Sequence, residues 1–176
     1  RKHIFLRARF AVSATEQELF KKLEELGIKT RTYRHQPVYT VEENKALRGD
    51  LPGGHCKNLF LRDKKRNMWL VVAEEDRTID LKSLRRRLDT SGNLSFGNAE
   101  LLAEILGVEP GSVTPFALIN DPDHRVCVVL DRQMLGHEVL NYHPLENAAT
   151  TAISPKDLVR FVEAFGHRVD VMDLDE

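Results

Sequence analysis

The sequence contains only two cysteines, Cys56 and Cys127, which are too few for a disulfide framework in a chain of 176 residues. It has no apolar run as long as a membrane span, and its N-terminal residues show no signal-peptide pattern. We therefore expect a protein of the reducing cytoplasm that does not act at a membrane.

The common catalytic motifs are also missing. There is no GxSxG elbow, Walker loop or GxGxxG turn, and no HExxH or CxxC spacing. The seven histidines are scattered, and none pairs with another at the close helical spacing of a metal site. We expect neither a metal nor any other cofactor.

A large excess of positive charge is absent as well. The net charge of −1 argues against a protein that coats nucleic acid indiscriminately. Two local basic clusters exist: Arg62, Lys64, Lys65 and Arg66, and Lys82, Arg85, Arg86 and Arg87. Each is typical either of a solvated turn or helix face, or of a surface that binds a polyanion.

The composition, 41% hydrophobic and 30% charged, is that of a globular protein, and the length suits one domain over residues 1–176. Ser13 to Glu16 predict a capping box before a helix that ends at Gly27. Further helices are predicted over Val41–Leu47, from Asp80 to Leu88, from Asn98 to Gly107 and from Ser154 to Gly166.

Strands are predicted between the helices, at Lys29–Arg34, Cys56–Arg62, Met68–Ala73, Phe116–Asn120, Arg125–Asp131, Val139–Tyr142, Ala148–Ile153 and Arg168–Met172. Charged or turn-forming residues between the second and third of these, and between the fourth and fifth, indicate two hairpins. Hairpins require antiparallel pairing, so a purely parallel sheet is excluded. We predict an α+β fold with a mixed, largely antiparallel sheet, curled into a barrel-like core with flanking helices.

Lys57 is the first candidate for a functional residue. It shares one face of its strand with Leu59 and Leu61, because strand side chains alternate. A cation on an apolar face is costly unless an anion meets it there, and phosphate is the obvious biological anion. Alternatively, Lys57 extends to water. Asn58 follows it directly, and Gly53 and Gly54 precede it, so a ligand could approach bare backbone.

Two further segments could contribute to a site. Gly111 and Pro115 fix the ends of a loop that leaves amides and carbonyls of Ser112, Val113 and Thr114 free to bind an oxyanion or a water. The same loop could be a plain connector. Pro144 holds His143 extended at a strand end, next to Tyr142, where it could face a pocket or bond locally.

These features, in this order, resemble the YbaK-type prolyl-tRNA editing family. The matching segments are Gln36-Pro37-Val38-Tyr39-Thr40-Val41-Glu42-Glu43, Lys57-Asn58-Leu59-Phe60-Leu61-Arg62-Asp63, Gly111-Ser112-Val113-Thr114-Pro115, and His143-Pro144-Leu145 with Asn147, Thr150 and Thr151. The match extends from about Glu16 to Val171. Many members have threonine after the lysine, whereas Asn58 is more similar to the free-standing, alanine-specific branch (ProXp-ala or PrdX).

The resemblance implies a trans-acting deacylase that hydrolyses Ala-tRNA(Pro), and a barrel-like mixed sheet. It implies that Lys57 anchors the terminal phosphate of the tRNA, and that Asn58, Gly111 and His143 complete the catalytic site. Ser112, Val113, Thr114, Pro115 and Tyr142 would then bind the substrate. Arg62, Lys64, Lys65, Arg85 and Arg86 are the candidates for contacts with the acceptor stem.

Several alternatives stay open at this point. The protein could deacylate a tRNA carrying cysteine or serine, or bind nucleotides or tRNA without hydrolysis. The basic clusters could instead be a docking surface for prolyl-tRNA synthetase. The sequence does not predict the oligomeric state, or whether His143 activates water.

Overall fold

The computed structural model describes residues 13–38, 40–48 and 51–174. Residues 1–12 and 175–176 of the expected domain, Tyr39 of the family motif, and positions 49–50, which follow the helix predicted over Val41–Leu47, lie outside the described residues. None of the helices in the described part is long and apolar enough to cross a membrane.

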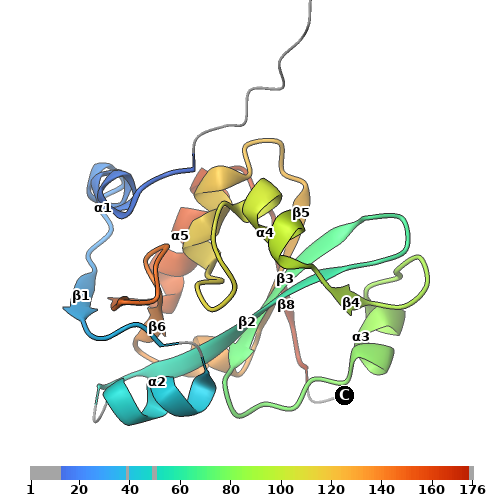
Figure 1. The fold of residues 1–176 in the computed structure, drawn as a ribbon, viewed down its shortest axis with the longest axis horizontal. Coiled ribbons are helices and arrows are strands. Elements are labelled where there is room, and N and C mark those ends of the chain that lie inside the picture. Colours follow the sequence, from blue (N-terminus) through green and yellow to red (C-terminus); the bar gives the residue numbers. More distant parts are fainter. Residues whose placement is uncertain (1–12, 39, 49–50, 175–176) are drawn as a thin grey trace, which may run out of the picture.

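Helices and strands alternate along the chain (Figure 1). Their order is α1 (Glu16–Glu25), β1 (Arg31–Arg34), α2 (Val41–Arg48), β2 (Gly54–Arg62), β3 (Met68–Glu74), α3 (Leu81–Arg87), β4 (Ser95–Phe96), α4 (Ala99–Leu106), the 3-10 helix η1 (Pro115–Asn120), β5 (Val126–Asp131), the 3-10 helix η2 (Met134–Gly136), β6 (Leu140–Tyr142), β7 (Ala149–Ile153), α5 (Pro155–Ala164) and β8 (Val169–Met172).

The strands form one mixed sheet in the order β1-β7-β6-β2-β3-β5-β8, with the short β4 paired to β2. The pairs β1–β7, β6–β7, β2–β3 and β2–β4 are antiparallel, whereas β2–β6, β3–β5 and β5–β8 are parallel. The α+β class and the mixed sheet are therefore as predicted. The path of pairing is open, with β1 at one end and β8 at the other among the described strands.

Local side-chain chemistry sets the helix starts. The Asn98 side chain accepts a hydrogen bond from the Leu101 amide at 2.8 Å, and α4 ends at Gly107 in the left-handed conformation (φ 64°). Ser154 accepts from the Asp157 amide at the start of α5, where Pro155 takes the first helical position. These starts were predicted. The capping box at Ser13 was wrong, because Thr15 caps α1 by accepting from the Glu18 amide.

Two predictions around η1 were also wrong. Pro115–Asn120 is a 3-10 helix and no strand, because Thr114 accepts a hydrogen bond from the Phe116 amide and Pro115 begins the turn. Without that strand there is no second hairpin. The expected partner strand, β5, lies parallel to β3 instead, with Val128 beside Leu70.

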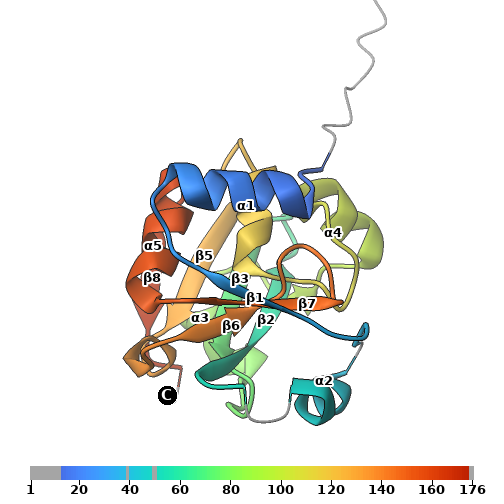
Figure 2. The ribbon, with the colours of Figure 1, turned by 90° about the vertical axis from the view of Figure 1, so that its left-hand side faces the viewer.

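Apolar side chains pack on both faces of the β2–β3–β5 part of the sheet. One face, with Phe60, packs against α1, α4, α5 and η1 in the main core. The other face, with Leu61, packs against Leu84 of α3 in a smaller cluster. Figure 1 shows α3 on the opposite side of these strands from α4 and α5, and Figure 2 shows α1 lying between α5 and α4. Strand β2 therefore directs alternate residues into two different environments.

Candidate functional site

Strand β2 places Lys57 and Asn58 on opposite faces of the sheet. Lys57 lies beside Ala73 on the face of the smaller cluster, in line with Leu59 and Leu61 as predicted. Asn58 lies with Cys56 on the other face. The two neighbouring candidates thus contribute to different sides of β2.

A small pocket of about 20 Å³ opens on the Asn58 side, at the junction of β2, β6 and β7. It is lined by His55, Cys56, Asn58, Asn141, Tyr142, His143 and Thr150. Three of the predicted site residues, Asn58, Tyr142 and His143, therefore come together. The volume suits one group of the size of a water or a methyl group.

The hydrogen bonding of His143 defines its tautomer. Its Nδ1 lies 2.7 Å from the Ala149 carbonyl oxygen, which can only accept, so Nδ1 carries the proton and Nε2 keeps its lone pair. Burial lowers the pKa of His143, against the opposing effect of the Ala149 carbonyl, and nearby His35 lowers it further. The imidazole is therefore neutral at physiological pH and offers an acceptor.

Sequence reasoning missed His35, which supports the pocket from β1. Its Nδ1 donates to the Gln36 carbonyl at 2.7 Å, so its Nε2 accepts the Thr150 hydroxyl at 2.8 Å. The rings of His35 and His143 stand edge to face with centroids 6.1 Å apart. Only the antiparallel pairing of β1 with β7 brings these residues together, so the one local signal was the adjacency of His35 to the family motif.

Cys56 and Tyr142 line the pocket in uncharged forms. Burial raises the pKa of Cys56 to about 12, so the residue is a thiol and not a thiolate nucleophile. Burial also raises the pKa of Tyr142 well above its ordinary value. The Tyr142 hydroxyl donates to Met134 Sδ at 3.2 Å. The pocket therefore offers no covalent nucleophile among these two residues.

Lys57 is half-buried beside the segment that leads into α3. Its Nζ donates to the main-chain carbonyl of Arg77, and burial lowers its pKa, with Asp76 opposing that effect. Arg77 Nε in turn binds Asp131 Oδ2 at 2.7 Å, and both side chains are nearly inaccessible to water. The structure therefore does not bring the Lys57 ammonium into the pocket of Asn58 and His143.

The loop from Gly111 to Pro115 contributes no side chain to the lining of the pocket. Gly111 has a positive φ of 91°, which favours glycine, while Ser112 and Thr114 are buried. Figures 1 and 2 both place the segment between α4 and η1 on the same side of β2 as the segment between β6 and β7. The loop therefore lies on the same side of β2 as the segment that carries His143.

The segments that carry the two basic clusters are linked at the far end of β2. The Lys64 amide donates to the Ser91 carbonyl at 3.0 Å, which ties the β2–β3 turn to the segment after α3. On that segment, Asn93 accepts a hydrogen bond from Arg85. Phe96, which is 60% exposed, lies on β4 beside Leu61. We call Arg62, Lys64, Lys65, Arg66, Arg85, Arg86 and Phe96 the basic patch.

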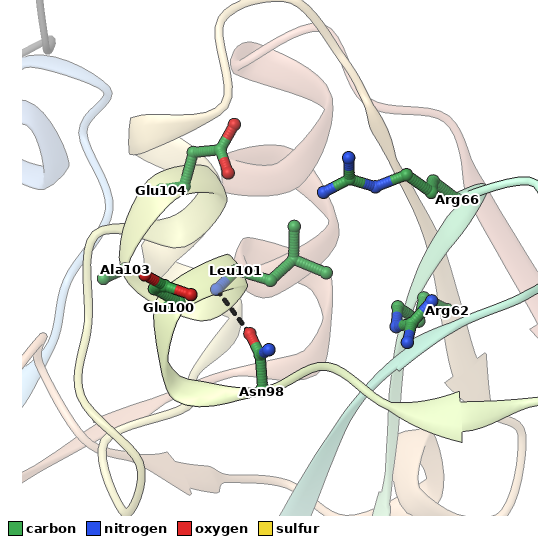
Figure 3. A pocket seen from close by; sticks show the side chains of 7 residues that line it. All are labelled: Arg62, Arg66, Asn98, Glu100, Leu101, Ala103 and Glu104. Atoms are coloured by element: carbon green, nitrogen blue, oxygen red, sulfur yellow. Dashed lines mark hydrogen bonds between the residues drawn. The ribbon is translucent and has the colours of Figure 1, made fainter.

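A cleft of about 550 Å³ separates the basic patch from α4. Arg62 and Arg66 face it from the β2–β3 hairpin, and Asn98, Glu100 and Glu104 face it from α4 (Figure 3). The charges across this cleft are of both signs. A polyanion is therefore expected to bind the lysines and arginines on the outer rim and not the interior of the cleft.

The chain is similar to known proteins in sequence and in fold. A family model described as "Aminoacyl-tRNA editing domain" matches residues 35–161. "Prolyl-tRNA synthetase associated domain-containing protein 1" of Mus musculus is 42% identical over 94% of this chain and 99% of its own length. "Prolyl-tRNA editing protein ProX" of Acetoanaerobium sticklandii is 38% identical over 90% of this chain and 97% of its own length.

The fold is also similar to solved structures. A crystal structure of a candidate trans-editing enzyme for prolyl tRNA synthetase superposes with a TM-score of 0.70 at 21% identity, and covers 93% of this chain and 98% of that chain. The structure of a hypothetical protein, APE2540, gives a TM-score of 0.73 at 23% identity, with 92% and 100% covered. At these identities the likeness concerns the fold alone.

Proposed function

The chain belongs to the aminoacyl-tRNA editing domain family and is an editing enzyme, and from this premise we propose that it hydrolyses the ester of alanine wrongly attached to tRNA(Pro). The names of the relatives support prolyl-tRNA as the target. We further propose that residues 1–176 act as one editing domain, in trans and in the cytoplasm, on tRNA released by prolyl-tRNA synthetase.

The observation that carries this proposal is the small, uncharged pocket beside Asn58 and His143. A synthetase pocket shaped for proline excludes the smaller alanine poorly, because each missing methylene costs only about 1–3 kcal/mol of discrimination. A second pocket can admit alanine and exclude the bulkier proline by size. A pocket of about 20 Å³ has room for one small group of the alanyl moiety and no room for the ring of proline, as such a sieve requires.

The chemistry asks little of the protein beyond positioning. An aminoacyl ester is already activated, so the enzyme needs to hold the substrate, place a water and stabilise an oxyanion. We propose that backbone groups of Gly111–Pro115 orient the ester and the water. Neutral His143 would accept a hydrogen bond from the substrate, and Lys57 would bind the terminal phosphate.

Incubation with a panel of aminoacyl-tRNAs tests the proposed function. Ala-tRNA(Pro) is expected to lose its ester about 100-fold faster than in buffer, a contribution that positioned donors and acceptors can supply. Pro-tRNA(Pro) is expected to hydrolyse at the spontaneous rate. Preferential hydrolysis of Ser-tRNA or Cys-tRNA would show that serine or cysteine, and not alanine, is the amino acid removed. Tight binding without turnover would contradict the enzyme proposal.

We also propose that the basic patch contacts the acceptor stem of the tRNA. It lies at the end of the strand that carries Asn58, about 13 Å further along β2 at the usual rise per residue. It combines exposed cations with an exposed aromatic ring, which is typical of surfaces that bind nucleic acid.

Reversal of charge at Arg85 and Arg86 (R85E/R86E) is expected to weaken tRNA binding and to flatten its salt dependence. The slope of log K against log salt should fall by about 0.7–0.9 for each phosphate that the variant no longer neutralises. Binding titrations at several salt concentrations measure it. K21E/K156E, which alters exposed lysines on α1 and α5, is the matched control. Equal slopes for both variants would exclude α3 from the interface.

A further inference from the structure

The pocket beside His143 contains hydrogen-bond acceptors that have no donor. Asn141 is 5% exposed, and its Nδ2 donates to the carbonyls of Pro52 at 3.0 Å and Gly54 at 3.2 Å. These two bonds fix the amide, so Oδ1 of Asn141 is turned away from both carbonyls. This oxygen is buried without a partner, and so is Oδ1 of Asn58.

Most side-chain donors around the pocket are directed elsewhere. The thiol of Cys56 points to the Gly54 carbonyl at 3.9 Å, and Nε2 of His55 lies 2.9 Å from the Leu51 carbonyl. The Tyr142 hydroxyl bonds to Met134, and the Thr150 hydroxyl bonds to His35. His143 uses its N–H on Ala149 and keeps the lone pair of Nε2. Apart from the amide N–H groups of Asn58, these side chains use their donors on the protein, and three acceptors of the lining remain.

Unpaired buried acceptors destabilise the protein when no ligand is bound. A buried acceptor without a donor loses its hydration and gains nothing, so it destabilises the fold by about 1–3 kcal/mol. A ligand that supplies the donors accounts for such acceptors. A water molecule brings only two donors for the three acceptors. A primary ammonium brings three N–H donors and no acceptor, and it has the size of the pocket.

We infer that Asn58, Asn141 and His143 form a cradle for the α-ammonium group of the aminoacyl ester. This inference rests on the proposed function and adds the group by which the substrate is recognised. It gives a second basis for sparing proline. The α-nitrogen of a prolyl ester is a secondary ammonium with two N–H groups, so one acceptor would stay unpaired while the ring carbons crowd the others.

The test compares Ala-tRNA(Pro) with lactyl-tRNA(Pro), in which a hydroxyl replaces the ammonium. The wild type and Asn58→Leu are assayed on both esters. For each ester, the rate of the variant is divided by the rate of the wild type, so the different intrinsic reactivities of the two esters cancel. Asn58→Leu is expected to lower kcat/KM for the alanyl ester by about 10- to 100-fold. Its loss on the lactyl ester should be smaller, because a hydroxyl supplies one donor to the three acceptors whereas the ammonium supplies three.

Two further measurements separate recognition from folding. Asn58→Leu removes an unpaired buried oxygen, so its melting temperature should equal or exceed that of the wild type. Asn58→Asp keeps the oxygen and adds a negative charge, so it should lower KM for the alanyl ester relative to KM for the lactyl ester, whose hydroxyl is neutral. A purely structural role for Asn58 predicts neither effect.

The outcomes distinguish the cradle from the function it rests on. Equal losses on both esters, in both variants, would overturn the cradle and leave the editing function in place. A wild-type protein that hydrolyses neither ester would overturn the proposed function itself. A larger loss on the alanyl ester than on the lactyl ester supports both.

Discussion

Alanine in place of Lys57 is expected to lower kcat/KM for Ala-tRNA(Pro) by roughly a hundredfold, the size of effect produced by removing a charged partner from a partly buried contact. The physical reason is the proposed bond between the Lys57 ammonium and the terminal phosphate of the tRNA. Burial already lowers the pKa of this ammonium, and an anion is what would compensate that cost. Single-turnover deacylation measures the loss.

The pairing of β2 explains how a lysine outside the pocket could serve the same substrate. One edge of β2 pairs with β6 at Gly54 and His55, and with β4 at Leu61 and Arg62. Between these pairings, in the part of the chain that the structure describes, the edge has no strand partner. Lys57 and Asn58 lie on this stretch, on opposite faces. A nucleotide that crosses the edge would meet Lys57 on one side while its aminoacyl group meets Asn58 on the other.

Two variants control for trivial causes of inactivity. Lys64→Ala removes an exposed lysine of the β2–β3 turn and is expected to leave the single-turnover rate nearly unchanged. Lys57→Arg keeps the charge but changes its shape and reach, so it should recover only part of the rate. Circular dichroism should show Lys57→Ala to be folded, because the bond of Nζ to the Arg77 carbonyl is the one shown for it among the described residues. A wild-type rate for Lys57→Ala would exclude the phosphate contact.

The local parts of the fold were predictable because their causes are local. The side chains of Asn98 and Ser154 begin their helices through bonds to amides three residues away, which any chain with that spacing can form. The β2–β3 hairpin follows from two apolar runs and a short charged turn. The parallel pairing of β3 with β5 joins segments about 60 residues apart, and no nearby residue signals it.

The same distinction applies to the candidate site. The alternation of β2 correctly placed Lys57 on the face of Leu59 and Leu61, and it also implies that Asn58 points the other way. The roles of His35 and Asn141 depend on contacts with Thr150 and with the carbonyls of Pro52 and Gly54. These contacts exist only after β1, β2, β6 and β7 are assembled. A sequence motif can therefore indicate the residues of this pocket, but not which of their atoms face it.

The ion pair between Arg77 and Asp131 is expected to have the largest effect on stability. Asp131 is fully buried and Arg77 nearly so, with Nε and Oδ2 2.7 Å apart. Asp131→Ala removes the carboxylate that Nε of Arg77 binds in this buried pair, and the free energy of unfolding should fall by about 3–5 kcal/mol. Urea denaturation measures the loss as a lower midpoint at an unchanged slope.

The double variant Arg77→Met/Asp131→Leu separates the charge from the packing. With both charges gone, no desolvated ion remains, so the double variant should be more stable than Asp131→Ala by about 1–4 kcal/mol. Equal stabilities would show that Asp131 contributes through packing alone. The double variant also bears on the site, because Arg77 carries the carbonyl that holds Lys57. If the ion pair positions this carbonyl, the double variant should be folded and should still have a raised KM for Ala-tRNA(Pro). In a protein that already carries Lys57→Ala, the double substitution should not raise KM further.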